Sequence, residues 1–273
     1  MLTDLTEREL EQLQRNRKYW GERTARIQQR LTEKSIKQTE KQLAKYYSNS
    51  MENVIGQFEK TYNKLLSTIS EGKEPTPADL YKLDTYWKMQ AQLKQELQKL
   101  GENQLAVMSD NFVAEYQNIY SALALEGDMF NEIDRAAAEQ MINQIWCADG
   151  QTWSNRVWKN VDRLQQTLND GLLDCVVTGK KPSELKAILQ ERFGVSFNGA
   201  DMIVRTEMAH IQTQAAKKRY QDAGIGEVEI LADKDERQCE ICGKLHKQRF
   251  PIGAAVPIPA HPRCRCCIVP VID

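Results

Sequence analysis

The sequence predicts a mainly α-helical protein that begins with long helices and ends in a small α+β module stapled by zinc. Apolar residues recur at steps of three, four and seven over most of residues 1–223, which is the period of amphipathic helices. After Gly224 the period changes to two, as in strands. Five of the seven cysteines lie between positions 239 and 267. A short region with few apolar residues needs a staple, and zinc binding supplies one.

The length of the chain favours more than one structural part. A chain of 273 residues is near the upper limit for a single hydrophobic core. We expect a helical arm over 1–75, a helical bundle over 76–150 and a third domain over 151–273. Within the third domain, residues 225–273 form the zinc-binding tail.

Charge and hydropathy indicate the cellular compartment and the classes of partner. Residues 1–50 carry 11 Lys and Arg against 7 Asp and Glu, whereas residues 51–150 carry 8 against 16. The whole-chain pI of 6.4 is far below the value of about 9 typical of nucleic-acid-binding domains. No apolar run approaches the roughly 20 residues that cross a bilayer, and the start lacks a secretory segment. We therefore expect a reducing cytoplasm and no membrane, where clustered cysteines indicate metal before disulfide.

The first helix follows from an apolar stripe through the arm. Its members are Leu10, Leu13, Trp20, Ile27 and Leu31 and, after a slip, Ile36, Leu43 and Tyr47. A more regular stripe covers 51–69, and residues 71–77 break it. The length and polarity of this helix exceed what a small bundle needs, so we expect it to contact a partner or further copies of this chain.

Three helices follow in the predicted bundle. Thr76 as N-cap and Pro77 in the first turn begin a helix that ends at Gly101. The next runs from Leu105 to Gly127, and the two are expected to be antiparallel neighbours. A third amphipathic helix covers about 129–146.

The third domain opens with another regular helix. One face carries Trp153, Val157, Val161, Leu164, Leu168, Leu172 and Cys175. A break at 179–182 precedes a short helix over 183–193, and a further helix over 199–223 ends before Gly224. Residues 228–232 then alternate as an edge-like strand, with 267–271 as its partner. Cys147 and Cys175 are interpreted as core residues.

Two turns in the tail have the spacing of metal ligands. Cys239 and Cys242 form a CxxC turn, and His261 and Cys264 form an HxxC turn that contains a proline. Two such turns supply the four ligands of a tetrahedral zinc site, with backbone N–H groups pointing at the sulfurs. Cys266 is the alternative fourth ligand, with Cys267 beside it.

Other interpretations of the tail stay open. Disulfides are the alternative to a metal, and His246 is a rival ligand. Four Cys and His ligands would close the shell of the ion, which argues against catalysis. The alternative enzyme is a metal-dependent, nuclease-like hydrolase, with Glu207, His210, Asp233 and Asp235 as its acid and base groups. Basic residues around the turns either neutralise the thiolates or meet phosphates of DNA. These residues are Arg237, Lys244, Lys247, Arg249, Arg263 and Arg265.

The ordered motifs of residues 153–271 resemble a known family. They are Trp153 to Trp158, Arg205-Thr206-Glu207, Tyr220, Ala223-Gly224, Asp235 to Cys242 with Leu245, Phe250-Pro251, and His261 to Cys266 before a last Val-Pro. This set is similar to the phage minor head protein family named after the F protein of phage Mu. Gln238 and His246-Lys247 depart from the family pattern, while the ligand spacing is kept.

The resemblance implies a function in a virus particle. It implies a low-copy minor capsid protein of head morphogenesis, made in the host cytoplasm and placed in the virion near the portal. Its expected partners are the portal protein, the major capsid or scaffolding protein and packaged DNA. It implies no established reaction, so an enzyme is not expected. Arg205, Glu207, Asp235 and Arg237 are expected to support the zinc loop, and zinc-dependent nucleic-acid binding is the alternative function.

Overall fold

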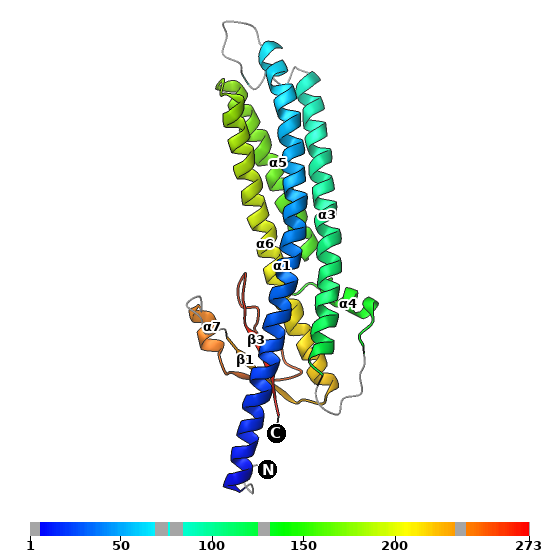
Figure 1. The fold of residues 1–273 in the computed structure, drawn as a ribbon, viewed down its shortest axis with the longest axis vertical. Coiled ribbons are helices and arrows are strands. Elements are labelled where there is room, and N and C mark those ends of the chain that lie inside the picture. The colour runs from blue at the N-terminus through cyan, green and yellow to red at the C-terminus, as the bar shows by residue number, and fades with distance from the viewer. Residues whose placement is uncertain (1–5, 69–75, 77–83, 125–131, 233–238, 273) are drawn as a thin grey trace. The chain divides into compact units, whose positions relative to one another are not determined.

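The computed structural model confirms the mainly helical class with a small C-terminal sheet (Figure 1). It describes residues 6–68, 76, 84–124, 132–232 and 239–272. The helices are α1 (Glu7–Thr68), α3 (Asp84–Ala122), α4 (Arg135–Ile142), α5 (Trp153–Val177), α6 (Pro182–Asp222) and α7 (Glu240–Leu245), and the strands are β1 (Glu227–Leu231), β2 (Arg249–Pro251) and β3 (Cys267–Val271).

These elements form two compact units. Unit 1 contains residues 1–38, 109–144 and 204–273, and unit 2 contains 39–108 and 145–203. Segments of α1, α3 and α6 therefore contribute to both. Because the units interleave along the chain, they do not test the boundaries predicted at 75 and 150, which stay a prediction.

Two helix ends predicted at glycines are wrong. Helix α3 continues through Gly101, so the two segments predicted as antiparallel neighbours form one helix. Helix α6 continues through Gly194, a predicted end, and through Gly199, the predicted start of the next helix. A Cβ atom on Gly101 would lie 2.4 Å from the ring of Trp158, and one on Gly199 would lie 2.7 Å from Asn160 Oδ1. Both glycines are thus required for close packing inside unit 2. The break expected at 71–77 falls largely outside the described residues.

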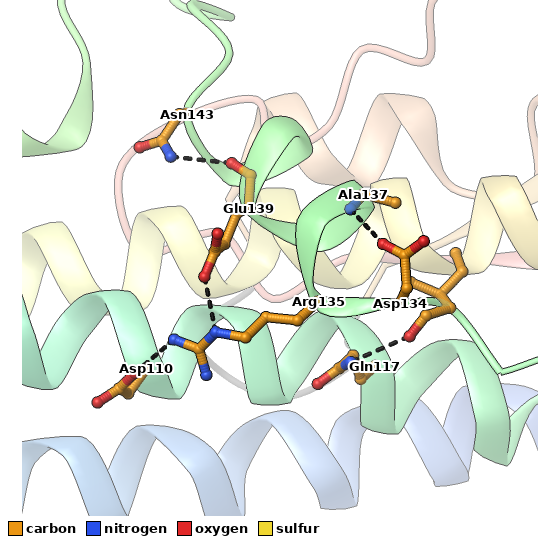
Figure 2. A network of polar contacts seen from close by, with 8 residues as sticks. Asp110, Gln117, Asp134, Arg135, Ala137, Glu139 and Asn143 are labelled. Atoms are coloured by element: carbon orange, nitrogen blue, oxygen red, sulfur yellow. Dashed lines mark hydrogen bonds and ion pairs between the residues drawn. The ribbon is translucent and has the colours of Figure 1, made fainter.

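Helix α4 is shorter than the predicted segment over 129–146. It begins after Asp134, whose side chain caps the helix by accepting from Ala137 N at 2.7 Å. Arg135 forms ion pairs with Glu139 (2.6 Å) and with Asp110 of α3 (2.8 Å), and Gln117 of α3 donates to Ile133 O (Figure 2). Exposed pairs of this kind contribute little stability but fix the position of α4 on α3.

The buried face of α1 in unit 1 is more polar than predicted. Thr24, Gln28 and Thr32 are buried, whereas Leu13, Trp20, Ile27 and Leu31 of the predicted stripe are only half-buried. Gln28 Nε2 donates to Ile268 O of β3 at 2.8 Å, and Gln212 of α6 donates to Gln28 Oε1 at 3.3 Å. Hydrogen bonds to partners far along the chain therefore replace apolar contacts on this face.

A buried carboxylate on α3 gives unit 1 a pH dependence. Glu115 accepts from Thr32 Oγ1 (2.5 Å) and Ser35 Oγ (2.6 Å) of α1. Burial raises the pKa of Glu115, although both hydroxyl donors act in the opposite direction. The folded state therefore favours the protonated carboxyl. Its contribution to stability is complete below the ordinary pKa and is lost as the pH rises through the folded pKa.

Replacing Glu115 with Gln is expected to remove this dependence. The amide keeps a donor and an acceptor for the two hydroxyls but has no proton to release. Urea denaturation from pH 4 to pH 8 should show a smaller fall in unfolding free energy for Glu115→Gln than for the parent chain. An equal fall in both proteins would contradict the assignment to Glu115.

The sheet has the strand order β2-β1-β3 and is antiparallel throughout. Val228 pairs with Pro270 and Ile230 with Ile268, so the predicted pairing of 228–232 with 267–271 is confirmed. Strand β1 is the central strand rather than an edge, because β2 pairs with its other side. All five residues of β3 are buried, and Cys267 packs with Ala25 and Val269. Cys267 is thus a core residue of unit 1.

Candidate metal centre

The first turn of the centre is the start of α7. Cys239 is the N-cap of this helix, and its sulfur accepts from the backbone N–H of Cys242 at 3.4 Å. Gly243 N donates to Cys239 O at 2.9 Å. The two-residue spacing and the helical turn bring Cys239 and Cys242 to one side of the chain. Cys242 is buried, whereas Cys239 is half-buried.

The second turn is fixed by its own backbone and by α6. Cys264 N donates to His261 O at 3.2 Å, and Arg263 between them has a positive φ of 61°. Arg263 N donates to Thr206 Oγ1 at 3.1 Å. Thr206 therefore anchors the turn to α6. The sequence placed Thr206 in a motif but gave no signal for this contact.

The two turns meet at Cys242. Ligand atoms of Cys239, Cys242 and His261 lie within 4.8 Å of one another, and so do those of Cys242, Cys264 and Cys266. The Cys242 and Cys264 sulfurs are 3.8 Å apart, which is the separation of about 3.8 Å between two thiolates on a tetrahedral ion with bonds of about 2.3 Å. Cys242 Sγ lies 3.1 Å from His261 Nε2, somewhat closer than zinc ligands stand. The donor set fits a thiophilic metal such as zinc.

Hydrogen bonds prepare several donors for metal binding. Nδ1 of His261 lies 2.8 Å from Pro262 O. A carbonyl can only accept, so Nδ1 carries a hydrogen, and in the neutral form of the ring, the form that binds metals, the Nε2 lone pair is presented to the cluster. A hydrogen bond from Cys266 lowers the pKa of Cys264 to about 5, and the backbone N–H of Cys242 lowers the pKa of Cys239. Thiolates are the metal-binding form of cysteine.

The other cluster thiols are held protonated by their surroundings. Burial raises the pKa of Cys242 to about 12, and the Cys264 sulfur, together with burial, raises the pKa of Cys266. Binding an ion at Cys242 therefore releases a proton. The contrast between Cys264 as thiolate and Cys266 as its donor favours Cys264 as the fourth ligand, which stays a prediction.

The disulfides, the rival ligand and the acid and base groups considered from the sequence can be compared with the structure. All seven cysteines are free, so the disulfide alternative is not realised. His246 belongs to neither ligand group among the described residues, and its Nδ1 accepts from Ala232 N at 3.2 Å. Glu207 and His210 are buried on α6, and burial lowers the pKa of His210 to about 4. Neither belongs to a ligand group in the part of the chain that the structure describes, and Asp233 lies outside that part.

Of the four residues expected to support the zinc loop, Arg205 and Glu207 lie among the described residues. Arg205 forms an ion pair of 4.0 Å with Glu33 of α1, and its expected contact with the loop stays a prediction. The hydroxyl that binds the loop comes from the next residue along the chain. Asp235 and Arg237 lie outside the described residues, so their role stays a prediction.

Comparison with protein families gives a match over the segment that contains this cluster. Residues 166–269 match the family model described as Phage Mu protein F like protein. This family segment contains both metal turns, Thr206 and most of the sheet, and it agrees with the resemblance drawn from the motifs of 153–271. The comparisons with curated proteins and with solved structures found no match. Over this segment the chain is therefore similar to a family of phage head proteins.

The helices also bear on the membrane expectation. Across the described residues, no helix has both the length and the apolar character that a bilayer span requires.

Proposed function

We propose that this chain is a minor head protein of a phage, present in few copies in the virion and associated with the portal in the inner prohead. In this proposal it helps head assembly and the packaging or delivery of DNA. The match of residues 166–269 to the Phage Mu protein F like family is the observation that supports it. Four Cys and His donors would fill the coordination shell of the ion. This favours a structural rather than a catalytic tail, since catalytic zinc sites keep a position open for water.

The metal in this proposal is zinc, and its role is to hold the tail folded. The tail consists of two metal-binding turns and a three-stranded sheet, and its apolar core is small. Binding free energy of a structural ion is folding free energy in such a region. The folded tail would then offer a rigid surface to the portal.

Expression of the phage head proteins with and without the portal tests the partner. The chain is expected to co-purify with the portal and to be missing from particles assembled without it. Quantitative mass spectrometry of both particle types gives its copy number relative to the major capsid protein. Equal incorporation in both would contradict portal association and would favour the capsid or scaffolding protein as the partner.

DNA binding is the second candidate, supported by a patch on α1. Arg23, Arg26 and Arg30 line a hollow of about 380 Å³ beside Tyr19, which is 58% exposed. Arg23 also stacks on Trp20, with its guanidinium carbon 4.7 Å from the ring centre. Arginines and exposed aromatic rings are the groups that bind phosphates and stack on bases. Retention of DNA that falls steeply with salt, without portal binding, would favour this function.

A further inference from the structure

Unit 1 contains a cleft that shares no residue with the metal ligand groups and only Glu22 with the hollow lined by Arg23, Arg26 and Arg30. It has a volume of about 730 Å³ and lies between the N-terminal part of α1 and the sheet. The lining includes the apolar residues Ala25 of α1, Leu231 of β1, and Val269 and Val271 of β3, which are called the floor below. Ligand clefts of folded proteins have volumes of about 300–1,000 Å³ and mostly apolar linings. This cleft has the size and floor of a binding site.

The lining of the cleft is positively charged overall. Four basic side chains contribute, from Arg17 and Lys18 of α1, Lys247 beside β2 and Arg249 of β2. Two acidic side chains, Glu22 and Glu229, also line it, and Glu229 forms an ion pair of 3.3 Å with Arg249. Positive charge around an apolar floor complements an occupant that carries both carboxylates and apolar side chains.

Gly21 keeps the middle of the cleft open. This glycine is buried within α1, where glycine costs about 1 kcal/mol relative to alanine. A Cβ atom would meet only Val269 Cγ2, at an ordinary distance of 3.8 Å. Gly101 and Gly199 differ, because a Cβ there would clash with a neighbour. Packing therefore does not require glycine at position 21, and the missing side chain leaves room in the cleft that a large side chain such as methionine would fill.

The occupant cannot extend the sheet at β3. Two carbonyls along this edge already accept hydrogen bonds from α1. Ile268 O of β3 accepts from Gln28, and Ile272 O, just after β3, accepts from Arg17, both at 2.8 Å. Pro270 between them has no backbone N–H to donate. Recognition must therefore come from side chains that fill the floor and pair with the charged rim.

We propose that this cleft binds an acidic, apolar segment of a partner protein. An apolar side chain of the segment lies over Gly21 and contacts Val269, and its carboxylates pair with Lys18 and Lys247. The alternative anionic polymer, nucleic acid, fits less well. Glu22 and Glu229 interrupt the positive rim, so a regularly spaced phosphate backbone would meet both, whereas a protein segment can place its carboxylates only at the lysines. The apolar residues of the lining contribute nothing to phosphate binding. This inference does not depend on the phage-head proposal or on the identity of the metal.

Selection from a random 12-residue peptide library against the purified full chain tests the proposal. Selected peptides are expected to combine Asp or Glu with large apolar residues. Their binding, measured by fluorescence anisotropy, should weaken at least tenfold for Gly21→Met, which fills the cleft. Gly21→Ala is the matched control and should bind within twofold of the parent chain, since its Cβ makes only an ordinary contact.

The rim gives a second test that does not alter the floor. Lys18→Glu and Lys247→Glu replace exposed residues and are expected to weaken the same peptides about tenfold each, with less salt dependence than the parent. Circular dichroism and metal content check the fold of every variant. No enriched peptides, enrichment of basic peptides, or binding unchanged by both kinds of substitution would overturn the proposal. Competition by duplex DNA that is lost in the Lys→Glu variants would overturn it in favour of nucleic acid.

Discussion

Replacement of Cys242 with Ser is expected to abolish metal binding and to unfold the tail while the helices persist. Cys242 is the member shared by the two ligand groups found among the described residues, and its side chain is buried against both turns. Serine is a poor ligand for a thiophilic ion. Structural zinc sites contribute about 10–16 kcal/mol of apparent binding free energy, which is as large as the total stability of an ordinary domain, about 5–15 kcal/mol. Loss of the site is therefore expected to unfold β1, β2 and β3.

Native mass spectrometry and hydrogen exchange measure the two parts of this prediction. The parent chain should carry one zinc ion and Cys242→Ser none, and peptides from 239–271 should lose protection in the variant. Protection of α5 in unit 2 should stay, because that helix shares no residue with the site. Cys147→Ser is the matched control, a half-buried cysteine outside both ligand groups. A Cys242→Ser chain that keeps one ion would contradict the site.

The fourth ligand can be identified with the same measurements. Cys264→Ser is expected to lose the ion, since its thiolate is a direct donor in this assignment. Cys266→Ser is expected to keep it at reduced affinity, because the Cys266 thiol donates to Cys264 instead of binding. The reverse result would make Cys266 the ligand, the alternative that the sequence left open.

Sequence periodicity predicted the elements whose partners are other apolar residues. The stripe from Trp153 to Cys175 is buried throughout on α5, and the pairing of β1 with β3 follows from alternation in both segments. In each case one physical rule, burial of an apolar face, decides the structure. The clustering of the metal turns followed from ligand chemistry in the same way.

Predictions failed where the outcome depends on a neighbour far along the chain. The buried face of α1 near Gln28 is polar because Ile268 O, Gln212 and Glu115 supply hydrogen bonds, and no local pattern announces them. Thr206 was overlooked for the same reason, since its partner is the backbone of Arg263. Glycine inside a helical pattern is ambiguous, because it either ends a helix or admits a close neighbour. Gly224, with φ of 74°, does the first, and Gly101 does the second.

The role of Gly101 gives the second large expected effect. In a solvent-exposed helix, Gly→Ala stabilises by about 1 kcal/mol through helix propensity. At Gly101 the new Cβ would lie 2.4, 2.8 and 3.0 Å from three ring carbons of Trp158, so the ring or a helix must move. Overpacking of this kind costs about 1–3 kcal/mol. After subtraction of the propensity gain, Gly101→Ala is therefore expected to lower the free energy of unfolding by up to about 2 kcal/mol.

A second background separates the contact from propensity. With Trp158→Ala in place, the space beside α3 is empty, and Gly101→Ala should become stabilising because only the propensity gain remains. Gly194→Ala is the matched control, an exposed helical glycine of unit 2 whose Cβ would meet no atom within 4 Å, and it should stabilise in both backgrounds. Urea denaturation followed by circular dichroism gives the four free-energy differences, one for each substitution in each background. If Gly101→Ala were stabilising beside an intact Trp158, the close approach of α5 to α3 would not be the reason for glycine at this position.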